Sequence, residues 1–167
     1  MIWLIAIAVI ALVVVTVNVV MRAQARRLEE RVRRDRPGWT VRRAHAAPAL
    51  KSALEADGVW RPELRNLGAS DVVLAAGPDA VELWCPPGQA PVLRREWRDV
   101  SAITTGGTTW EFTEVPAVVL HSRHGTLIPV VLAAGGKRHT WADQAATDVV
   151  VAELRTLRDD AERRPHA

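Results

Sequence analysis

Few residues of this chain have the types and spacing that catalysis or metal binding requires. His121 and His124 are three positions apart, so on one strand their side chains would point to opposite faces and could not share a metal ion. Cys85 is the single cysteine, which excludes an intramolecular disulfide and is consistent with a reducing compartment. Because it lies between Trp84 and Pro86, we expect it to pack at a strand end rather than to act as a nucleophile.

The glycine pairs and the serines carry no catalytic motif either. Gly106-Gly107 and Gly135-Gly136 lack the strand-to-helix context of a phosphate-binding loop, so both pairs indicate turns. Serine occurs at four positions, and no Ser-His-Asp order or spaced carboxylate pair stands out. The sequence therefore predicts a protein that is not an enzyme, with no metal ion and no cofactor.

The clearest positional signal is the apolar run of residues 1–21, which contains no charged side chain. Twenty helical residues span roughly 30 Å, the thickness of the hydrocarbon core of a bilayer. The run therefore predicts a transmembrane helix, with Trp3 at the outer interface. A cleaved signal peptide is the alternative, because Ala23-Gln24-Ala25 resembles a cleavage site. The length of the run, the lack of a preceding basic residue and Arg22 inside that site all favour an uncleaved anchor.

Residues 22–43 hold nine arginines against three acidic residues, a net charge of about +6. The positive-inside bias then places the amino terminus outside and the carboxyl-terminal part in the cytoplasm, at the cell (inner) membrane. An exported envelope protein with the reversed topology is the alternative. Residues 44–167 carry a net charge of about −3, so the folded part lacks the basic surface of a nucleic-acid reader, and we expect no nucleic-acid partner.

The arginine-rich segment is expected to form a juxtamembrane helix or linker, with Leu28 and Val32 as a thin apolar seam and Pro37-Gly38 at its end. Arginines beside an anionic leaflet are attracted to its surface, and they also determine topology. Specific recognition of lipid headgroups is the alternative role. The lipid bilayer is thus one predicted partner. The predicted membrane-surface contacts are Arg22, Arg26, Arg27, Arg31, Arg33 and Arg34.

Residues 44–68 are predicted to form either a helix docked on the following domain or a flexible linker. Pro48 suits the first turn of a short helix, and Asp57-Gly58 would end it. Trp60, Leu64 and Leu67 could pack this segment against the domain that comes after it. Its role in the protein is not determined by its composition.

Residues 69–158 are predicted to form a β domain with a carboxyl-terminal helix. Gly77-Pro78-Asp79 is typical of a type I turn, and Gly106-Gly107 is expected to close a two-residue hairpin that pairs Ile103 with Trp110. Pro116 would interrupt a run. The expected strands cover residues 72–75, 81–84, 92–105, 108–115, 117–121 and 127–132. Six or seven such strands indicate a sandwich or barrel.

One amphipathic helix is expected after these strands. Thr140 is the expected N-cap, with Asp143 completing a capping box. The helix would bury a stripe at helical spacing, formed by Ala146, Val150, Leu154 and Leu157. Residues 159–167 are predicted to be a charged, fraying tail.

The whole pattern, an anchor followed by arginines, strands and a capped helix, resembles small actinobacterial single-pass membrane proteins with a cytoplasmic pleckstrin-homology-like (PH-like) domain. The local sequence LRREWRDVSAI at 93–103 adds to this resemblance. The resemblance implies a PH-like barrel of six or seven strands capped by a carboxyl-terminal helix, over roughly residues 70–158. It also implies a binding or scaffolding module without chemistry.

The first hairpin loop, residues 75–80, contains no basic residue and one acid, so a phosphate pocket there would lack its cations. We therefore expect an interaction module that recruits or regulates a protein partner at the inner membrane face, with an anionic-lipid-binding module as the alternative. Of the seven tryptophans, Trp84, Trp97, Trp110 and Trp141 are expected to pack in the core. The sharper alternative is that Trp97 lies exposed in a partner groove. The candidate partner contacts are Arg94, Arg95, Trp97 and Arg98.

Overall fold

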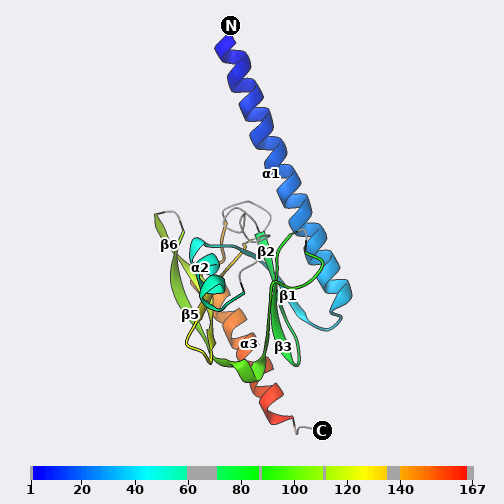
Figure 1. Ribbon diagram of the computed structural model, residues 1–167, viewed down its shortest axis with the longest axis vertical. Coiled ribbons are helices and arrows are strands. Elements are labelled where there is room, and N and C mark those ends of the chain that lie inside the picture. The colour runs from blue at the N-terminus through cyan, green and yellow to red at the C-terminus, as the bar shows by residue number, and fades with distance from the viewer. Residues whose placement is uncertain (1, 60–70, 87, 111, 135–139, 165–167) are drawn as a thin grey trace.

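The computed structural model describes residues 2–59, 71–86, 88–110, 112–134 and 140–164. Helix α1, Ile2–Asp35, is continuous over 34 residues. Its amino-terminal part projects away from the rest of the molecule, and its carboxyl-terminal part runs along a curled antiparallel sheet (Figure 1). Among the described residues, no helical segment combines the length and the apolar character that crossing a bilayer requires.

Seven antiparallel strands form a half-barrel. In chain order they are β1 Thr40–His45, β2 Asp71–Ala76, β3 Ala80–Trp84, β4 Leu93–Glu96, β5 Val100–Trp110, β6 Thr113–Ser122 and β7 Leu127–Leu132. Their spatial order is β4-β3-β2-β1-β7-β6-β5, so two meanders meet where β1 pairs with β7. That junction is short, with Ala44 opposite Leu132 and His45 opposite Val131. The two edge strands, β4 and β5, are joined in sequence by a 3-10 turn at Trp97–Asp99.

The main core lies between the curled sheet and two helices, α2 Pro48–Ala56 and α3 Gln144–Arg163. Alternating strand residues and the apolar stripes of both helices meet there, which satisfies the hydrophobic face of each element. Its large, fully buried side chains include Leu50, Leu54, Leu74, Leu83, Trp97, Ile103, Leu120, Ile128 and Leu154. The fold is therefore mostly β with a carboxyl-terminal helix, as predicted.

The outer face of β1, β2 and β3 is covered by the carboxyl-terminal part of α1. Leu28 and Val32 of the helix pack with Val41, Val73 and Trp84 of the sheet. The apolar seam predicted for the arginine-rich segment thus exists, and its partner is this domain. A third cluster joins Ala47, Val115, Ala117 and Val131, with Trp110 and Trp141 packed against it.

Several local predictions are confirmed. The backbone N–H of Gly77 donates to the carbonyl oxygen of Ala80 at 2.9 Å, which closes the β2–β3 hairpin. The turn between β6 and β7 contains Gly125 at φ +86°, a conformation that favours glycine. The helical alternative for the segment after Pro48 is also confirmed, and this helix ends before Gly58. Trp60, Leu64 and Leu67 lie outside the described residues, as do Gly135 and Gly136.

The predicted hairpin at Gly106-Gly107 is wrong. Both glycines lie inside β5, where Gly106 pairs with Ala117 and Gly107 with Pro116. Pro116 accordingly lies inside β6 and does not interrupt it. The reason is close packing, because a Cβ on Gly106 would lie 2.9 Å from Val119 Cγ2 and one on Gly107 would overlap the carboxylate of Glu114.

Strand β1 is a second difference from the sequence analysis, which assigned its residues to the arginine-rich segment and to the helix or linker after it. All six residues of β1 pair with β2. Val41 faces α1, whereas Arg42 reaches Glu153 on α3 at 3.3 Å. A run that contains two arginines therefore forms a central strand, because an apolar side chain and a paired charge satisfy its two faces.

The predicted start of the last helix is also wrong. Residues 140–142 run beside the end of β7, where the N–H of Ala142 donates to the carbonyl oxygen of Leu132 at 2.9 Å. Asp143 is the N-cap instead, and its carboxylate accepts from the N–H of Ala146 at 2.8 Å. The buried stripe contains Thr147 in place of Ala146, and the helix continues through Arg163 in the predicted tail.

Candidate functional site

A buried carboxylate lies where α1 meets the sheet. Glu82, in the middle of β3, is fully buried and accepts two hydrogen bonds from Arg36, just after the end of α1. The two nitrogen–oxygen distances are both 3.1 Å, from Arg36 Nε to Oε2 and from Arg36 Nη2 to Oε1. This fork-to-fork geometry is the strongest form of ion pair between these groups.

Two further donors complete the coordination of Glu82. Arg94 Nη1 on β4 donates to Oε1 at 2.7 Å, and Trp84 Nε1 donates to Oε2 at 3.1 Å. The second arm of Arg94 donates to Asp79 Oδ2 at 2.8 Å. The hydrogen bond to Glu82 raises the pKa of Arg94 above its ordinary value, despite an opposing effect of burial. We call Glu82, Arg36, Arg94, Asp79 and Trp84 the Glu82 cluster.

Aromatic rings enclose the Arg36 guanidinium. Its carbon lies 5.3 Å from the ring centroid of Trp39 and 5.7 Å from that of Trp84. Both distances are within the range of cation–π attraction. Gly77 lies flat against Trp39, whose indole occupies the space that a Cβ would need. The result is a partly buried ion pair, with a fully buried carboxylate and arginines that reach solvent, which joins the end of α1 to β3 and β4.

The predicted membrane-surface arginines lie on α1 as one group. The side chains of Arg26, Arg27, Arg31, Arg33 and Arg34 are exposed, whereas that of Arg22 lies outside what the structure describes. Arg33 Nη2 pairs with Glu29 Oε1 at 2.7 Å, and Arg31 Nη1 donates to the carbonyl oxygen of Gly88 at 3.0 Å. These arginines flank the seam that packs on the sheet, and their side chains are exposed even where they form these pairs.

The predicted partner contacts do not form one exposed patch. Arg94 belongs to the Glu82 cluster, and Arg95 pairs with Asp57 at the end of α2. Arg98 is exposed and pairs with Glu96 at 2.8 Å. Trp97 is buried and donates its Nε1 hydrogen to the carbonyl oxygen of Gly77 at 2.8 Å. The hypothesis of an exposed Trp97 is therefore wrong, because this ring fills the core.

Sequence reasoning missed the pairing of Glu82 with Arg36. Glu82 stands within the otherwise apolar strand AVELW, and a carboxylate in such a run demands a buried cation. That signal was present, but it does not say which arginine is the partner. Arg36 is 46 positions away, and its charge alone does not distinguish it from the other arginines of the basic segment.

Of the residues first considered for chemistry, Cys85 is buried, His121 is half-buried and His124 is exposed. Burial raises the pKa of the Cys85 thiol to about 12, which keeps it protonated and unreactive at neutral pH. His121 Nε2 lies 2.8 Å from Thr104 Oγ1, and His124 lies in the β6–β7 turn. His45 is buried between Asp71 and the carbonyl oxygen of Thr140. Within the described ranges, no three His, Cys, Asp or Glu side chains gather as a metal site would require.

Two open grooves mark the surface of the domain. One, of about 620 Å³, lies between α1, β1 and α3 and is lined in part by Arg33, Arg42 and Val149. The other, of about 730 Å³, lies between α2 and strands β5 to β7 and includes His124 and Pro129. Neither groove contains the Glu82 cluster. Comparison with known proteins finds neither a family model nor a curated protein that matches this chain.

Proposed function

We propose that this protein is a single-pass membrane protein whose PH-like domain recruits or regulates a protein partner at the inner face of the cell membrane. In this proposal residues 1–21 are the anchor, the amino terminus is outside, and the domain acts without catalysis. The absence of any charge in residues 1–21 supports the anchor, and the nine arginines of residues 22–43 support the orientation.

The observation that carries the proposal is the continuity of α1. Residues 2–21 and the segment that packs on the sheet belong to one helix, without a linker between them. A domain attached in this way cannot rotate freely about its anchor. It would hold one face toward the bilayer and the others toward the cytoplasm, as a recruitment platform requires.

The strand order supports the PH-like assignment. Two antiparallel meanders joined through β1 and β7, open between the edge strands and followed by a helix, match the outline that the sequence pattern led us to expect. Because β1 precedes β2, the turn at residues 77–79 is the second connection of the sheet and not the first hairpin loop, and its Asp79 pairs with Arg94. The preference for a protein partner over a phosphorylated headgroup therefore rests on the net charge of about −3 of residues 44–167.

Topology is tested with reporter fusions to the full chain after Arg163. We expect a green fluorescent protein fusion to be fluorescent and an alkaline phosphatase fusion to be inactive. Both fusions should remain in the membrane after carbonate washing. An active phosphatase would show that the domain is exported, and a protein released by carbonate would show that residues 1–21 do not anchor it.

Recruitment is tested by placing a photo-crosslinking amino acid at Arg98, at Val149 or at Arg34 of the full-length protein in its native membrane. These positions report on the 3-10 turn, on the groove between α1 and α3, and on the arginines of α1. We expect one protein adduct of defined mass from a domain position, removed by a charge reversal beside it. If no position gives a protein adduct, and the domain without residues 1–21 floats with anionic vesicles, the lipid-binding alternative is favoured.

A further inference from the structure

The turn between β5 and β6 carries an aromatic side chain that no described residue covers. Phe112, the single phenylalanine of the chain, is 103% exposed relative to a free residue. Among the described residues, most other exposed large hydrophobic side chains lie in the first 20 residues of α1. Outside α1, Leu127 and Val149 are the other two, and both are less exposed. A fully exposed phenylalanine ring leaves its whole apolar surface in water, and an apolar environment for it would be favourable.

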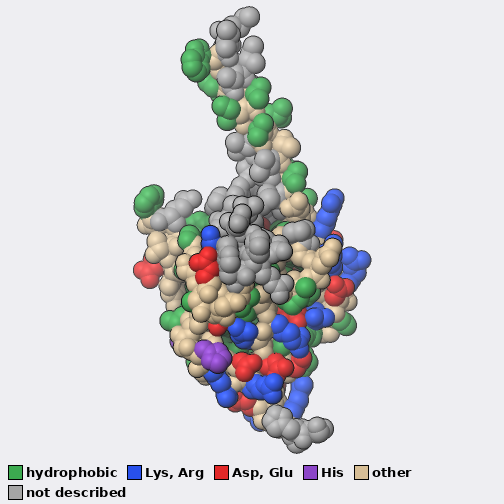
Figure 2. Space-filling model, in the orientation of Figure 1, with side chains coloured by type: hydrophobic (Ala, Val, Ile, Leu, Met, Phe, Trp, Pro, Cys, Tyr) green, Lys and Arg blue, Asp and Glu red, His purple; other side chains and the backbone are tan. Residues whose placement is uncertain are grey.

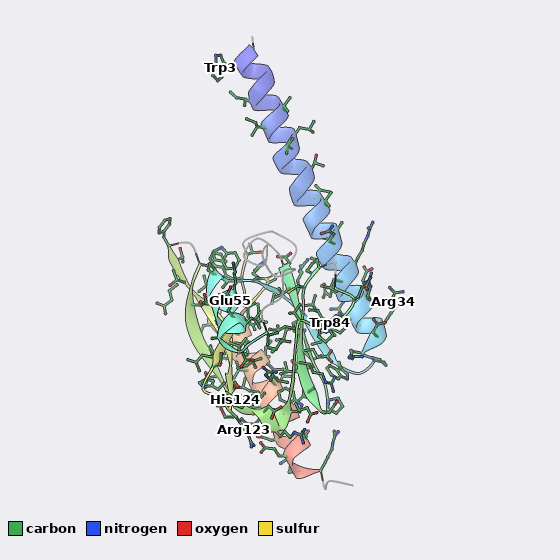
Figure 3. The ribbon with its side chains drawn as sticks, in the orientation of Figure 1. Trp3, Arg34, Glu55, Trp84, Arg123 and His124 are labelled. Carbon is green, nitrogen blue, oxygen red and sulfur yellow. The ribbon has the colours of Figure 1, made fainter. Side chains whose placement is uncertain are left out.

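The position of this turn points to such an environment. Strands β5 and β6 are the longest in the sheet, with 11 and 10 residues, and their hairpin rises at the end of the domain from which α1 projects (Figure 1). The opposite end of β6 leads to Arg123 and His124, which lie far from the amino-terminal half of α1 (Figure 3). The hairpin tip and the apolar part of α1 therefore face the same side.

The relation between the tip and α1 is fixed by packing. Leu28 and Val32 join the helix to the outer face of β1 to β3, and Arg36 joins its end to Glu82. Strand β1 in turn pairs with β7, and β7 with β6. If a membrane holds the first part of α1, the hairpin therefore has one fixed orientation relative to that membrane.

We propose that the β5–β6 tip is a second membrane contact, in which the Phe112 ring enters the boundary between headgroups and acyl chains. This inference rests on the proposed function, because it assumes that residues 1–21 are anchored. Phenylalanine is among the apolar side chains that interfacial helices bury at this depth. The neighbouring Glu114 is exposed and acidic, so the contact depends on the apolar ring and requires no anionic lipid.

The test measures the depth of a fluorescent label in the full-length protein. Phe112→Cys and His124→Cys are each labelled with an environment-sensitive nitrobenzoxadiazole probe and reconstituted into phosphatidylcholine vesicles. The native Cys85 is buried, and its raised pKa keeps it unreactive while the protein is folded. Equal thermal unfolding of the two labelled proteins checks that neither substitution disturbs the domain.

We expect a blue-shifted label at position 112 that spin-labelled lipids quench at least threefold more than the label at 124. If the protein floats with the vesicles but both labels behave as in water, the second contact is overturned while the anchor stands. If the label at 112 is blue-shifted but not quenched by lipid, the ring is covered by protein, such as a second copy of the chain, and the proposal is again overturned. Failure to float would refute the anchor and this inference together.

Discussion

The two halves of α1 belong to one helix but have different surroundings. In the docked half, residues 22–35, the buried side chains Ala25, Leu28 and Val32 form a single stripe, and arginines occupy most of the rest. In the apolar half, residues 2–21, exposed hydrophobic side chains point in several directions (Figure 2). The docked half finds its apolar partner in its own domain, whereas the exposed hydrophobic side chains described in the apolar half, such as Ile10 and Leu12, face away from it.

This difference shows that the distribution of apolar side chains around a helix indicates the medium in which the helix is stable. A helix with one apolar stripe is stable between a protein surface and water. A helix that is apolar on every side is stable only where every side meets an apolar medium, either lipid or the core of a protein. Under the proposed function this medium is lipid, and the boundary between the halves, near Arg22, lies at the membrane surface.

The largest effect is expected from charges in the apolar half. Ile10→Arg together with Val13→Arg should abolish retention in the carbonate-washed membrane fraction, because each arginine costs about 2.5 to 3.5 kcal/mol near the bilayer centre. Leucine at the same two positions is the matched control and should leave retention unchanged. If the arginine variant stays in the membrane, the two halves of α1 do not differ in the way proposed.

The next effect concerns the Glu82 cluster, which fixes the docked half. Glu82→Leu removes the acceptor shared by Arg36 and Arg94, and we expect a loss of about 2 to 4 kcal/mol in the free energy of unfolding in detergent. This is below the cost for a fully buried pair, because both arginines reach solvent. Glu96→Leu, which removes the exposed partner of Arg98, should cost less than about 1 kcal/mol. Equal losses would show that burial of Glu82 carries no special weight.

How much the sequence could predict depends on whether a signal is local. The β2–β3 turn and the helix after Pro48 were predictable because their turn residues and caps act within a few positions. The strand at 40–45 was not predictable, because its two arginines are typical of an exposed segment. The residue that pairs with Arg42 is Glu153, which is more than a hundred positions away in the sequence. For Gly106-Gly107 a local signal is present but has a distant cause. A pair of glycines usually indicates a turn, whereas here glycine is required because Val119 and Glu114 pack closely against the strand.

The candidate site obeys the same rule. The exposed arginines of α1 were identified from charge alone, because exposure is the default for a basic run. The arginine neighbours of Trp97 suggest a contact surface, but Trp97 lies in the 3-10 turn after β4, and its hydrogen bond to the carbonyl oxygen of Gly77 holds it in the core. Arg36 could not be separated from the other basic residues, because its partner Glu82 is distant in sequence.

A smaller effect is expected for the apolar seam of the docked half. Leu28→Ala should lower the free energy of unfolding by about 2 kcal/mol, the low end for a buried leucine, because the cavity opens at the edge of the helix–sheet interface. Leu12→Ala, on the exposed surface of the apolar half, should leave the unfolding of the domain unchanged. Denaturant unfolding of both variants in the same detergent makes the comparison. A loss at Leu12 that matches the loss at Leu28 would mean that the apolar half also packs on protein.

The smallest effect separates two arginines on the same helix end. Arg33→Gln breaks an exposed i,i+4 pair with Glu29 and should cost less than about 0.5 kcal/mol, because solvent screens that pair. Arg36→Gln leaves Glu82 buried with Arg94 and Trp84 as its remaining partners, and should cost about 1 to 2 kcal/mol. For a domain of this size, 1 kcal/mol shifts the melting temperature by roughly 2–4 °C, which thermal unfolding resolves. Both variants lose one positive charge, so a larger shift for Arg36 measures docking to the sheet, whereas equal shifts would reduce both residues to members of one basic segment.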